Sequence, residues 1–291
     1  AYGGPGAGHG GFGGRSGQDP NNQRGWYYDS VTDPREHGSG GAPGDLATEY
    51  GGSGGGLLLL DVGGTFTLNG RIRADGTDGF GAADTGGGGS GGAVNIRVAS
   101  LAGSGYITAH GGKAGAGTYG GGGAAGRIAL VVTASDSAAL KISAQGGAGG
   151  STGYSGADGT IYYKKPAGDA YGGLIISSQT FTNNEPTVVH SPASLTIGTM
   201  TLVSANFIST QTAITVTSSF TIAGIDQAYE LVSMKEPLTV LGGLGLTMSG
   251  NSQNTISSFT VRAPAKFLNN TGITVSSVTV NGALTFSGNS G

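Results

Sequence analysis

Three stretches of this chain repeat one another at a fixed interval of 35 residues. Each stretch contains a β-forming run and a closing phrase that ends on an alanine, and the three alanines are Ala74, Ala109 and Ala144. A constant period of this length is typical of solenoid and array proteins, in which each repeat packs against the next. A partial fourth unit closes at residues 159–163.

Within each repeat, apolar residues alternate with polar ones. In residues 93–98, the two valines and the isoleucine share one face, while Asn95 and Arg97 share the other. The same alternation recurs in residues 127–132. A period of two predicts a strand that is buried on one face only.

Glycine separates the predicted strands. It makes up 62 of the 291 residues, about three times its usual share, and tracts such as 86–89 and 120–123 recur in each repeat. Because glycine has no side chain, we expect these tracts to pack closely as polyglycine-II-like chains that satisfy each other's backbone groups. A flexible linker is the alternative for such tracts.

The composition changes near residue 173. Residues 1–173 hold 52 of the glycines, whereas residues 174–291 hold 10 glycines and 36 serines and threonines. The second region repeats an apolar-Thr-apolar phrase in pairs, as in residues 214–222, at irregular spacings near 20 residues. Threonine favours strands because its χ1 angle is restricted. Coils of this length predict a parallel β-helix.

These patterns predict an all-β chain, a parallel β-helix (β-solenoid) with Gly-rich, polyglycine-II-like loops. We expect residues 1–50 to form a Gly-rich N-terminal segment or cap with an aromatic cluster. Residues 51–173 are the Gly-rich region of 35-residue repeats, and residues 174–291 are the Thr/Ser-rich β-solenoid.

Charge and cysteine content exclude several classes of function and of site. Charged residues make up 11% of the chain, the net charge is −3, and no basic stripe is present. Nucleic-acid binding is therefore not expected, since it needs clustered Lys and Arg. The absence of cysteine excludes disulfides and thiolate metal sites. The longest apolar run, residues 57–60, is far shorter than the roughly 20 residues of a membrane helix. The first residue is Ala1 and not Met, so we expect a processed or partial chain.

The stretch from Gly3 to about Lys164 resembles a glycine-rich module that recurs in large secreted or surface proteins, mostly bacterial. The resemblance rests on ordered phrases that include GHGG at 8–11, LNGRI at 68–72 and GTIY at 159–162. It implies an extracellular or cell-surface scaffold without assigned catalysis. The Thr-rich remainder is similar to generic β-solenoid passengers and fibres.

The candidate binding residues lie between Trp26 and Glu49, where aromatic and acidic residues gather. Trp26, Tyr27, Tyr28 and Asp29 are candidates for glycan binding, because exposed aromatic rings stack on sugars. The alternative is a loop that folds over the open end of the solenoid with Trp26 as a plug. No motif places these groups in catalytic roles, so we predict no catalytic residue and no enzyme activity.

Metal and modification sites are sparse. Asp75 and Asp78 form a weak calcium candidate beside glycines, although calcium takes six to eight oxygen ligands and a structural turn is the alternative. No other cofactor or metal is predicted, since no two histidines have ligand spacing. Asn269 opens a glycosylation sequon that is meaningful only in a competent secretory pathway.

The function expected from these features is that of a structural subunit of an extracellular filament or surface matrix. The subunit would associate with itself head-to-tail through the apolar residues of its last rungs, Val278, Val280, Leu284 and Phe286. An adhesin or carbohydrate-binding module at a surface or phage tip is the alternative. A polysaccharide-degrading β-helix enzyme is a weaker one, because the outward positions are Ser and Thr instead of recurring charges.

Overall fold

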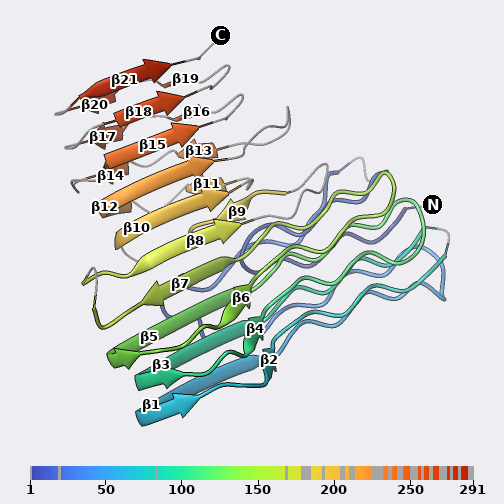
Figure 1. The fold of residues 1–291 in the computed structure, drawn as a ribbon. Helices are drawn as coiled ribbons and strands as arrows, with labels where there is room; N and C mark the ends of the chain where they lie inside the picture. The colour runs from blue at the N-terminus through green and yellow to red at the C-terminus, as the bar shows by residue number, and fades with distance from the viewer. Residues whose placement is uncertain are drawn as a thin grey trace.

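The computed structural model of the chain describes most of the Gly-rich part and the strands of the remainder. The described residues are 2–18, 21–82, 84–167, 170–177, 185–191, 194–203, 207–209, 214–223, 232–234, 238–240, 245–249, 255–256, 259–261, 265–268, 274–275, 278–280 and 283–287. They form an all-β structure in which successive coils stack into a β-solenoid (Figure 1). Within these residues there is no helix that is long and apolar enough to cross a membrane.

One long sheet runs through the whole stack. Its order along the main path is β1 (Leu57–Thr67), β3 (Ala93–Ala102), β5 (Arg127–Asp136), β7 (Thr160–Lys164), β8 (Gly173–Ser177), β10 (Leu195–Val203), β12 (Ile214–Ala223), β14 (Leu238–Val240), β17 (Phe259–Val261) and β20 (Val278–Val280). Beside this path, β12 also pairs with β15 (Gly245–Ser249), followed by β18 (Ala265–Leu268) and β21 (Leu284–Ser287). Each coil therefore adds one level to the same sheet.

Two smaller sheets close the coils. In the Gly-rich region, β2 (Arg71–Arg73), β4 (Tyr106–Thr108) and β6 (Lys141–Ser143) form a parallel three-stranded sheet. In the Thr-rich region, the second wall is a parallel five-stranded sheet with the order β19 (Thr274–Val275), β16 (Thr255–Ile256), β13 (Val232–Met234), β11 (Phe207–Ser209) and β9 (Thr187–Val188). Parallel pairing follows from the repeats, since each coil returns to start its strand at the same edge.

The core of the Gly-rich coils lies between the long sheet and the three-stranded sheet. Val94, Ile96 and Val98 on β3 face inward, and Ile107 on β4 meets them from the other wall. All four are at most 3% exposed. The predicted alternation on β3 is confirmed, but Asn95 on the outward face is also buried, because Asp33 and Pro34 accept hydrogen bonds from its amide.

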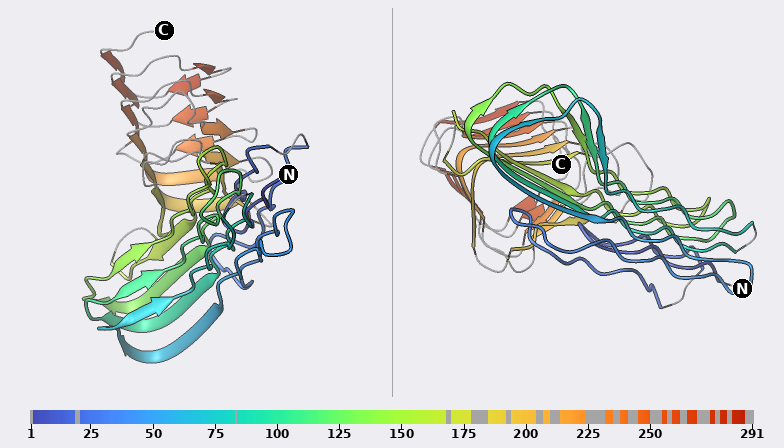
Figure 2. Two further views of the ribbon diagram at one scale, coloured as in Figure 1. Left: turned by 90° about the vertical axis from the view of Figure 1, so that its right-hand side faces the viewer. Right: turned by 90° about the horizontal axis from the view of Figure 1, so that it is seen from below.

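A bundle of extended Gly-rich segments projects from one side of the coils (Figure 2). We call it the Gly-rich bundle; its segments are residues 3–14, 38–44, 51–56, 74–81, 85–92, 109–116, 119–126, 144–150 and 153–159. They contain no regular strand, yet backbone hydrogen bonds join them throughout. Most of the backbone groups in residues 85–92 are buried, and buried N–H and C=O groups need partners.

The segment 86–92 shows how these partners are found. Its N–H groups three residues apart donate to the same neighbour: Gly86 and Gly89 to residues 77–80, Gly87 and Ser90 to residues 39–42, and Gly88 and Gly91 to residues 121–124. Its carbonyls accept from three further segments, around residues 7, 52–55 and 112–115. The segment therefore has six neighbours, of which three accept from its N–H groups and three donate to its carbonyls. A repeat of three residues is the period of a polyproline-II helix.

Glycine is required where these segments touch. A Cβ atom on Gly88 would lie 2.0 Å from the Gly112 carbonyl oxygen, and one on Gly122 would lie 1.9 Å from the Gly147 oxygen. Real Cβ atoms do not approach a backbone oxygen so closely. Any side chain at these positions would therefore separate the segments.

The two regions of the chain meet at an antiparallel joint. Every other strand pair within the described residues is parallel, but β7 and β8 run in opposite directions, with Ile161 opposite Ile175. This differs from the uniformly parallel arrangement that the repeats predict. The reason is the connection, since only residues 165–172 separate the two strands, and a parallel crossover needs a dozen or more residues.

The N-terminal segment lies beside the coils. Residues 3–14 and 38–44 belong to the Gly-rich bundle, while Asp33 and Pro34 cover part of the outer face of β3. The end strand β1 has no strand partner on its other side among the described residues. The plug predicted for this end is thus not formed by Trp26, which is 70% exposed beside residues 6, 25 and 40.

Candidate functional site

A broad groove of about 710 Å³ lies along the N-terminal segment. Its polar side chains come from one loop and its surroundings: Arg15, Asn21, Asn22, Gln23, Arg24 and Ser39. Backbone of glycines and alanines forms much of the remaining lining, and the exposed ring of Trp26 stands at its side. An aromatic face next to amide side chains is a combination that suits a sugar, which is apolar on one ring face and hydroxylated at its edge.

Neighbouring aromatic side chains pack against Trp26 and hold its ring in place. Its ring meets Phe12 edge-to-face at 5.4 Å between centroids, and Tyr27 meets the same Phe12 at 5.2 Å. The guanidinium of Arg24 lies 3.8 Å from the Phe12 centroid. Phe12 is 6% exposed. These contacts therefore fix the position of the Trp26 ring, which remains exposed at the surface.

A buried carboxylate pairs with both arginines of the groove. Glu185, which is 2% exposed, accepts a hydrogen bond from Arg15 Nε at 2.5 Å and pairs with Arg24 Nη1. Glu185 lies outside the Gly-rich repeats, and its N–H donates to the carbonyl of Ser155. The cations are thus tied to structure, and the groove offers an aromatic face and amides to a neutral ligand.

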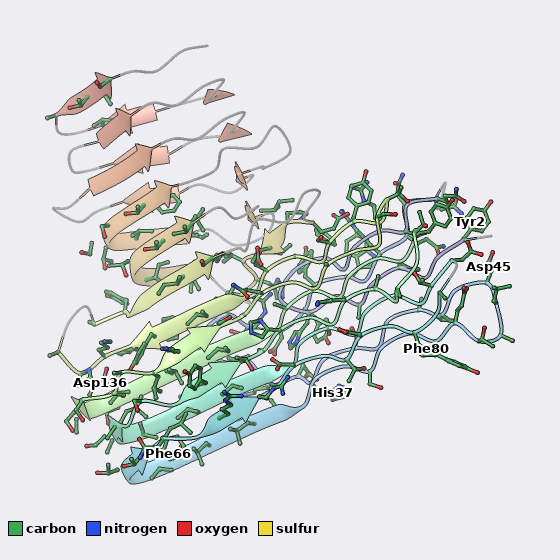
Figure 3. The ribbon with its side chains drawn as sticks, turned by 45° about the vertical axis from the view of Figure 1, so that its right-hand side comes forward. Tyr2, His37, Asp45, Phe66, Phe80 and Asp136 are labelled. Atoms are coloured by element: carbon green, nitrogen blue, oxygen red, sulfur yellow. The ribbon has the colours of Figure 1, made fainter. Side chains whose placement is uncertain are left out.

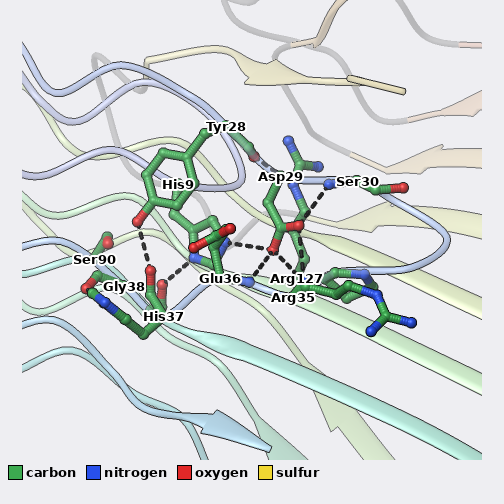
Figure 4. A network of polar contacts seen from close by, with 12 residues as sticks. His9, Tyr28, Asp29, Ser30, Arg35, Glu36, His37, Gly38, Ser90 and Arg127 are labelled. Carbon is green, nitrogen blue, oxygen red and sulfur yellow. Dashed lines mark hydrogen bonds and ion pairs between the residues drawn. The ribbon is translucent and has the colours of Figure 1, made fainter. Parts of the chain in front are cut away.

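Two of the four predicted binding residues have structural contacts instead. Tyr28 stacks on the fully buried His9 at 4.4 Å, and its hydroxyl donates to the carbonyl of His37 at 2.7 Å (Figure 4). Neither Tyr28 nor Asp29 lines the groove. The side chain of Asp29 is 5% exposed. The structure therefore brings only Trp26 of the four to the groove, with Tyr27 packed behind it.

Asp29 organises the loop that follows it. Its carboxylate accepts hydrogen bonds from the N–H groups of Ser30, Arg35 and Glu36, and His9 Nε2 lies 3.2 Å away. Burial acts to raise the pKa of Asp29, but these hydrogen bonds outweigh burial and hold the pKa below its ordinary value. His9 Nδ1 contacts the Gly91 carbonyl at 2.7 Å, so this nitrogen is the donor.

Arg127 at the start of β5 is fully buried and joins three parts of the chain. It donates to the carbonyl of Tyr28, to the hydroxyl of Thr160 and to the carbonyl of Val188, at 3.0–3.1 Å. Burial lowers its pKa to about 10, so it keeps its charge at neutral pH. Sequence reasoning missed this residue, because an arginine that begins a strand gives no sign of complete burial.

The weak calcium candidate has a different use in the structure. Asp75 accepts the N–H of His110 and Asp78 accepts the N–H of Lys113, both at 2.8 Å. Each acceptor lies 35 residues before its donor, so these carboxylates link adjacent coils. Among the described residues, no group of three acidic, histidine or cysteine side chains could hold a metal ion.

The predicted assembly residues lie on the outermost described strands, β20 and β21. Leu284 is 47% exposed, although it continues a register column through Ala265, Leu246 and Phe220 to Met200. Phe220 and Met200 in that column are fully buried. The side chains of Val278 and Phe286, like the sequon at Asn269, fall outside the described residues.

Two exposed apolar surfaces were not predicted. At the other end of the long sheet, Leu57 and Leu59 on β1 are 40% and 50% exposed. At the far tip of the Gly-rich bundle, four large side chains from three parts of the chain reach the surface, with Tyr2 and Phe80 labelled in Figure 3: Tyr2, Leu46, Tyr50 and Phe80. Backbone hydrogen bonds tie Asp45 to Tyr2 and Phe80 to Tyr50.

No family model, curated protein or solved structure matches this chain.

Proposed function

We propose that this protein is a structural subunit of an extracellular filament or surface matrix, and that copies associate through the ends of the solenoid. The observation that carries the proposal is the open edge of β1. This strand has 11 residues and, among the residues that the structure describes, pairs with β3 alone. An exposed strand edge presents unpaired backbone groups that recruit another strand.

The side chains of β1 also favour association at this edge. Leu58 and Leu60 are in register with Val94 and Ile96, which are at most 1% exposed on the next strand. Leu58 and Leu60 themselves are only half-buried, because no further coil covers them. Covering apolar area stabilises a contact by roughly 25 cal/mol per Å².

The proposed partner surface is the β21 end of a second copy. Because the antiparallel β7–β8 joint reverses the strand direction, β1 and β21 run in opposite directions. A head-to-tail contact between them would be antiparallel and would repeat the kind of joint that already connects the two regions. Such a contact does not close on itself and extends as a filament.

A double substitution of Leu57→Lys and Leu59→Lys tests the proposal. Both side chains are exposed, so the fold should tolerate lysine, while lysine on an edge strand opposes edge-to-edge association. Ile175→Lys is the matched control, because Ile175 is 39% exposed but lies on β8 inside the sheet. Light scattering and electron microscopy should show polymers for the parent and for the control, and monomers for the double variant. Monomeric parent protein, or polymers unchanged by the double substitution, would reject the proposal.

A second candidate function is an adhesin or carbohydrate-binding module. The aromatic tip of the Gly-rich bundle and the groove beside Trp26 favour it, since exposed apolar patches on monomers often mark interaction sites. Binding to an array of neutral glycans should be lost in Trp26→Ala if the groove is responsible. It should instead be lost in Tyr50→Ala with Phe80→Ala if the tip is responsible.

A further inference from the structure

The outer face of the three-stranded sheet carries a column of Arg71, Tyr106 and Lys141. These residues occupy the same register position on β2, β4 and β6, and all three are exposed. The guanidinium carbon of Arg71 lies 5.2 Å from the centroid of the Tyr106 ring, and Lys141 Nζ lies 5.3 Å from it. We propose that this column binds an acidic polysaccharide, through the two cations that Tyr106 holds apart.

The tyrosine fixes the spacing of the two cations. Arg71 and Lys141 come from the strands on opposite sides of β4, so the ring of Tyr106 lies between them. A cation over an aromatic ring is held by about 0.5–1 kcal/mol at an exposed site. Since neighbouring strands are about 4.8 Å apart, the backbones that carry the two cations are about 10 Å apart along the solenoid axis.

Both cations contact Tyr106 instead of a carboxylate, and Lys141 Nζ also donates to the Tyr106 hydroxyl at 3.5 Å. No ion pair joins Arg71 or Lys141 to an acidic side chain within the part of the chain that the structure describes. Arg73, two residues along β2, differs from them because its Nε donates to Asp75 at 2.8 Å. The free positive charge on this face therefore comes from Arg71 and Lys141.

A groove of about 300 Å³ adjoins the column and is lined by Arg71, Arg73, Asp75, Tyr106, Thr108 and His110. His110 adds no charge to it at neutral pH. Its Nδ1 accepts the N–H of Gln145 at 3.1 Å, and its Nε2 lies 3.2 Å from the Ser143 hydroxyl. This pattern fits the neutral tautomer with the proton on Nε2. The groove therefore offers polar contacts beside the two cations.

The geometry favours an acidic polysaccharide over other polyanions. A linear polysaccharide with an acidic group on every second sugar would present negative charges at a spacing of about 10 Å, which matches two strand intervals. Nucleic acid has more closely spaced phosphates and is bound by clustered Lys and Arg, whereas this chain has a net charge of −3. Bases also need a free aromatic ring for stacking, whereas the ring of Tyr106 already contacts Arg71 and Lys141.

Calorimetric titration with a hexasaccharide in which glucuronic acid alternates with a neutral N-acetylhexosamine tests the site, with a neutral galactose hexamer and single-stranded DNA as comparison ligands. We expect binding of the uronate that weakens with salt, and a loss of about tenfold or more in affinity for Arg71→Ala with Lys141→Ala. The matched control is Arg35→Ala with Arg97→Ala, which removes the same charge around Asp33 on another face. This control should retain the parent affinity.

Tyr106 provides a second readout. Tyr106→Phe keeps the ring between the cations but removes the hydroxyl that accepts from Lys141 Nζ. Its affinity should fall less than that of Tyr106→Ala, which should weaken binding although both cations remain. Equal binding of the neutral hexamer, tighter binding of DNA, or equal losses in the two double variants would overturn the proposal. So would an unchanged affinity in Arg71→Ala with Lys141→Ala. None of these results depends on whether the protein forms filaments, because the column lies on a side wall of the solenoid.

Discussion

The Gly-rich and Thr-rich regions build the same sheet by different means. In the Gly-rich region a coil takes about 35 residues, because the chain leaves the coil, runs out along the bundle and returns. In the Thr-rich region β10 and β12 begin 19 residues apart, at Leu195 and Ile214, and no comparable excursion separates them. Both arrangements add one level of the long sheet per coil, although after β12 that level consists of two strands, as in β14 and β15.

The difference shows two ways to provide hydrogen-bond partners for backbone N–H and C=O groups. The described strands of the Thr-rich coils pair through sheets, as does the inner part of each Gly-rich coil. The Gly-rich bundle instead surrounds each central segment with neighbours and uses hydrogen bonds in several directions. That arrangement requires backbones to lie closer together than side chains allow. The two regions should therefore respond differently to substitution, in a way that the following experiments rank.

The largest effect is expected from Gly88→Val in the bundle. The new side chain would collide with the backbone at Gly112, and no flexible group is there to move aside. We expect a loss of stability above the roughly 1–3 kcal/mol of ordinary overpacking, with Gly122→Val behaving alike. Gly64→Val is the control, since nothing lies within 4 Å of a Cβ at that position. Urea unfolding measures all three, and a tolerated Gly88→Val would mean that the bundle is loosely packed.

Arg127→Met tests the link between the two regions. The substitution leaves the carbonyls of Tyr28 and Val188 and the hydroxyl of Thr160 without their buried donor. We expect a cost of about 3–5 kcal/mol. Arg97→Met removes an exposed arginine that pairs with Asp33, and this should cost less than about 1 kcal/mol. Similar losses in thermal or urea unfolding for the two variants would contradict the role assigned to Arg127.

Truncation of the core compares the regions directly. Ile128 on β5 and Ile197 on β10 are both fully buried on the same sheet. Replacing either with alanine should cost about 2–5 kcal/mol, because the lost contacts are alike. Hydrogen exchange of each variant would show which coils open. A much smaller loss for Ile128→Ala would indicate that the Gly-rich bundle holds its coils together without the core.

The smallest expected effect is on the pH dependence of stability, through His110. Burial lowers the pKa of His110 below its ordinary 6.5, so the unfolded chain takes up a proton at higher pH than the folded protein. The stability that depends on neutral His110 is therefore present above 6.5 and is lost as the pH falls through the folded pKa. His110→Gln should remove this component, since Gln145 occupies the equivalent place on the next coil. Melting temperatures measured above and below 6.5 should converge in the variant, and an undiminished pH dependence would assign it elsewhere.

The sequence was sufficient for the fold class, because two kinds of evidence in it are local. The 35-residue period and the alternation in residues 93–98 predict stacked parallel strands within the repeats. The same period indicated that glycine tracts recur together, and hence that they pack. The alanines at 74, 109 and 144, which marked the repeat, are all buried at 3% exposure or less.

The candidate sites were less predictable, because their residues meet across long sequence separations. The sequence indicated that Tyr28 and Asp29 are surface residues. In the folded protein, Tyr28 stacks on His9, and the loop after Asp29 surrounds its carboxylate. Glu185 and Arg127 became buried charges through partners more than 60 residues away, among them Arg15 and Val188. No local pattern encodes such pairings.

The sequence by itself determined how each coil is made, and the tertiary structure decided which surfaces are left open. Periodicity fixes the strand and the direction of its side chains, since both follow from backbone geometry over a few residues. Whether a strand edge such as that of β1 is covered, or whether Arg71 and Lys141 line up beside Tyr106, depends on where distant coils and the N-terminal segment lie. Burial and charge spacing are properties of that assembly, and they arise only when the coils have stacked.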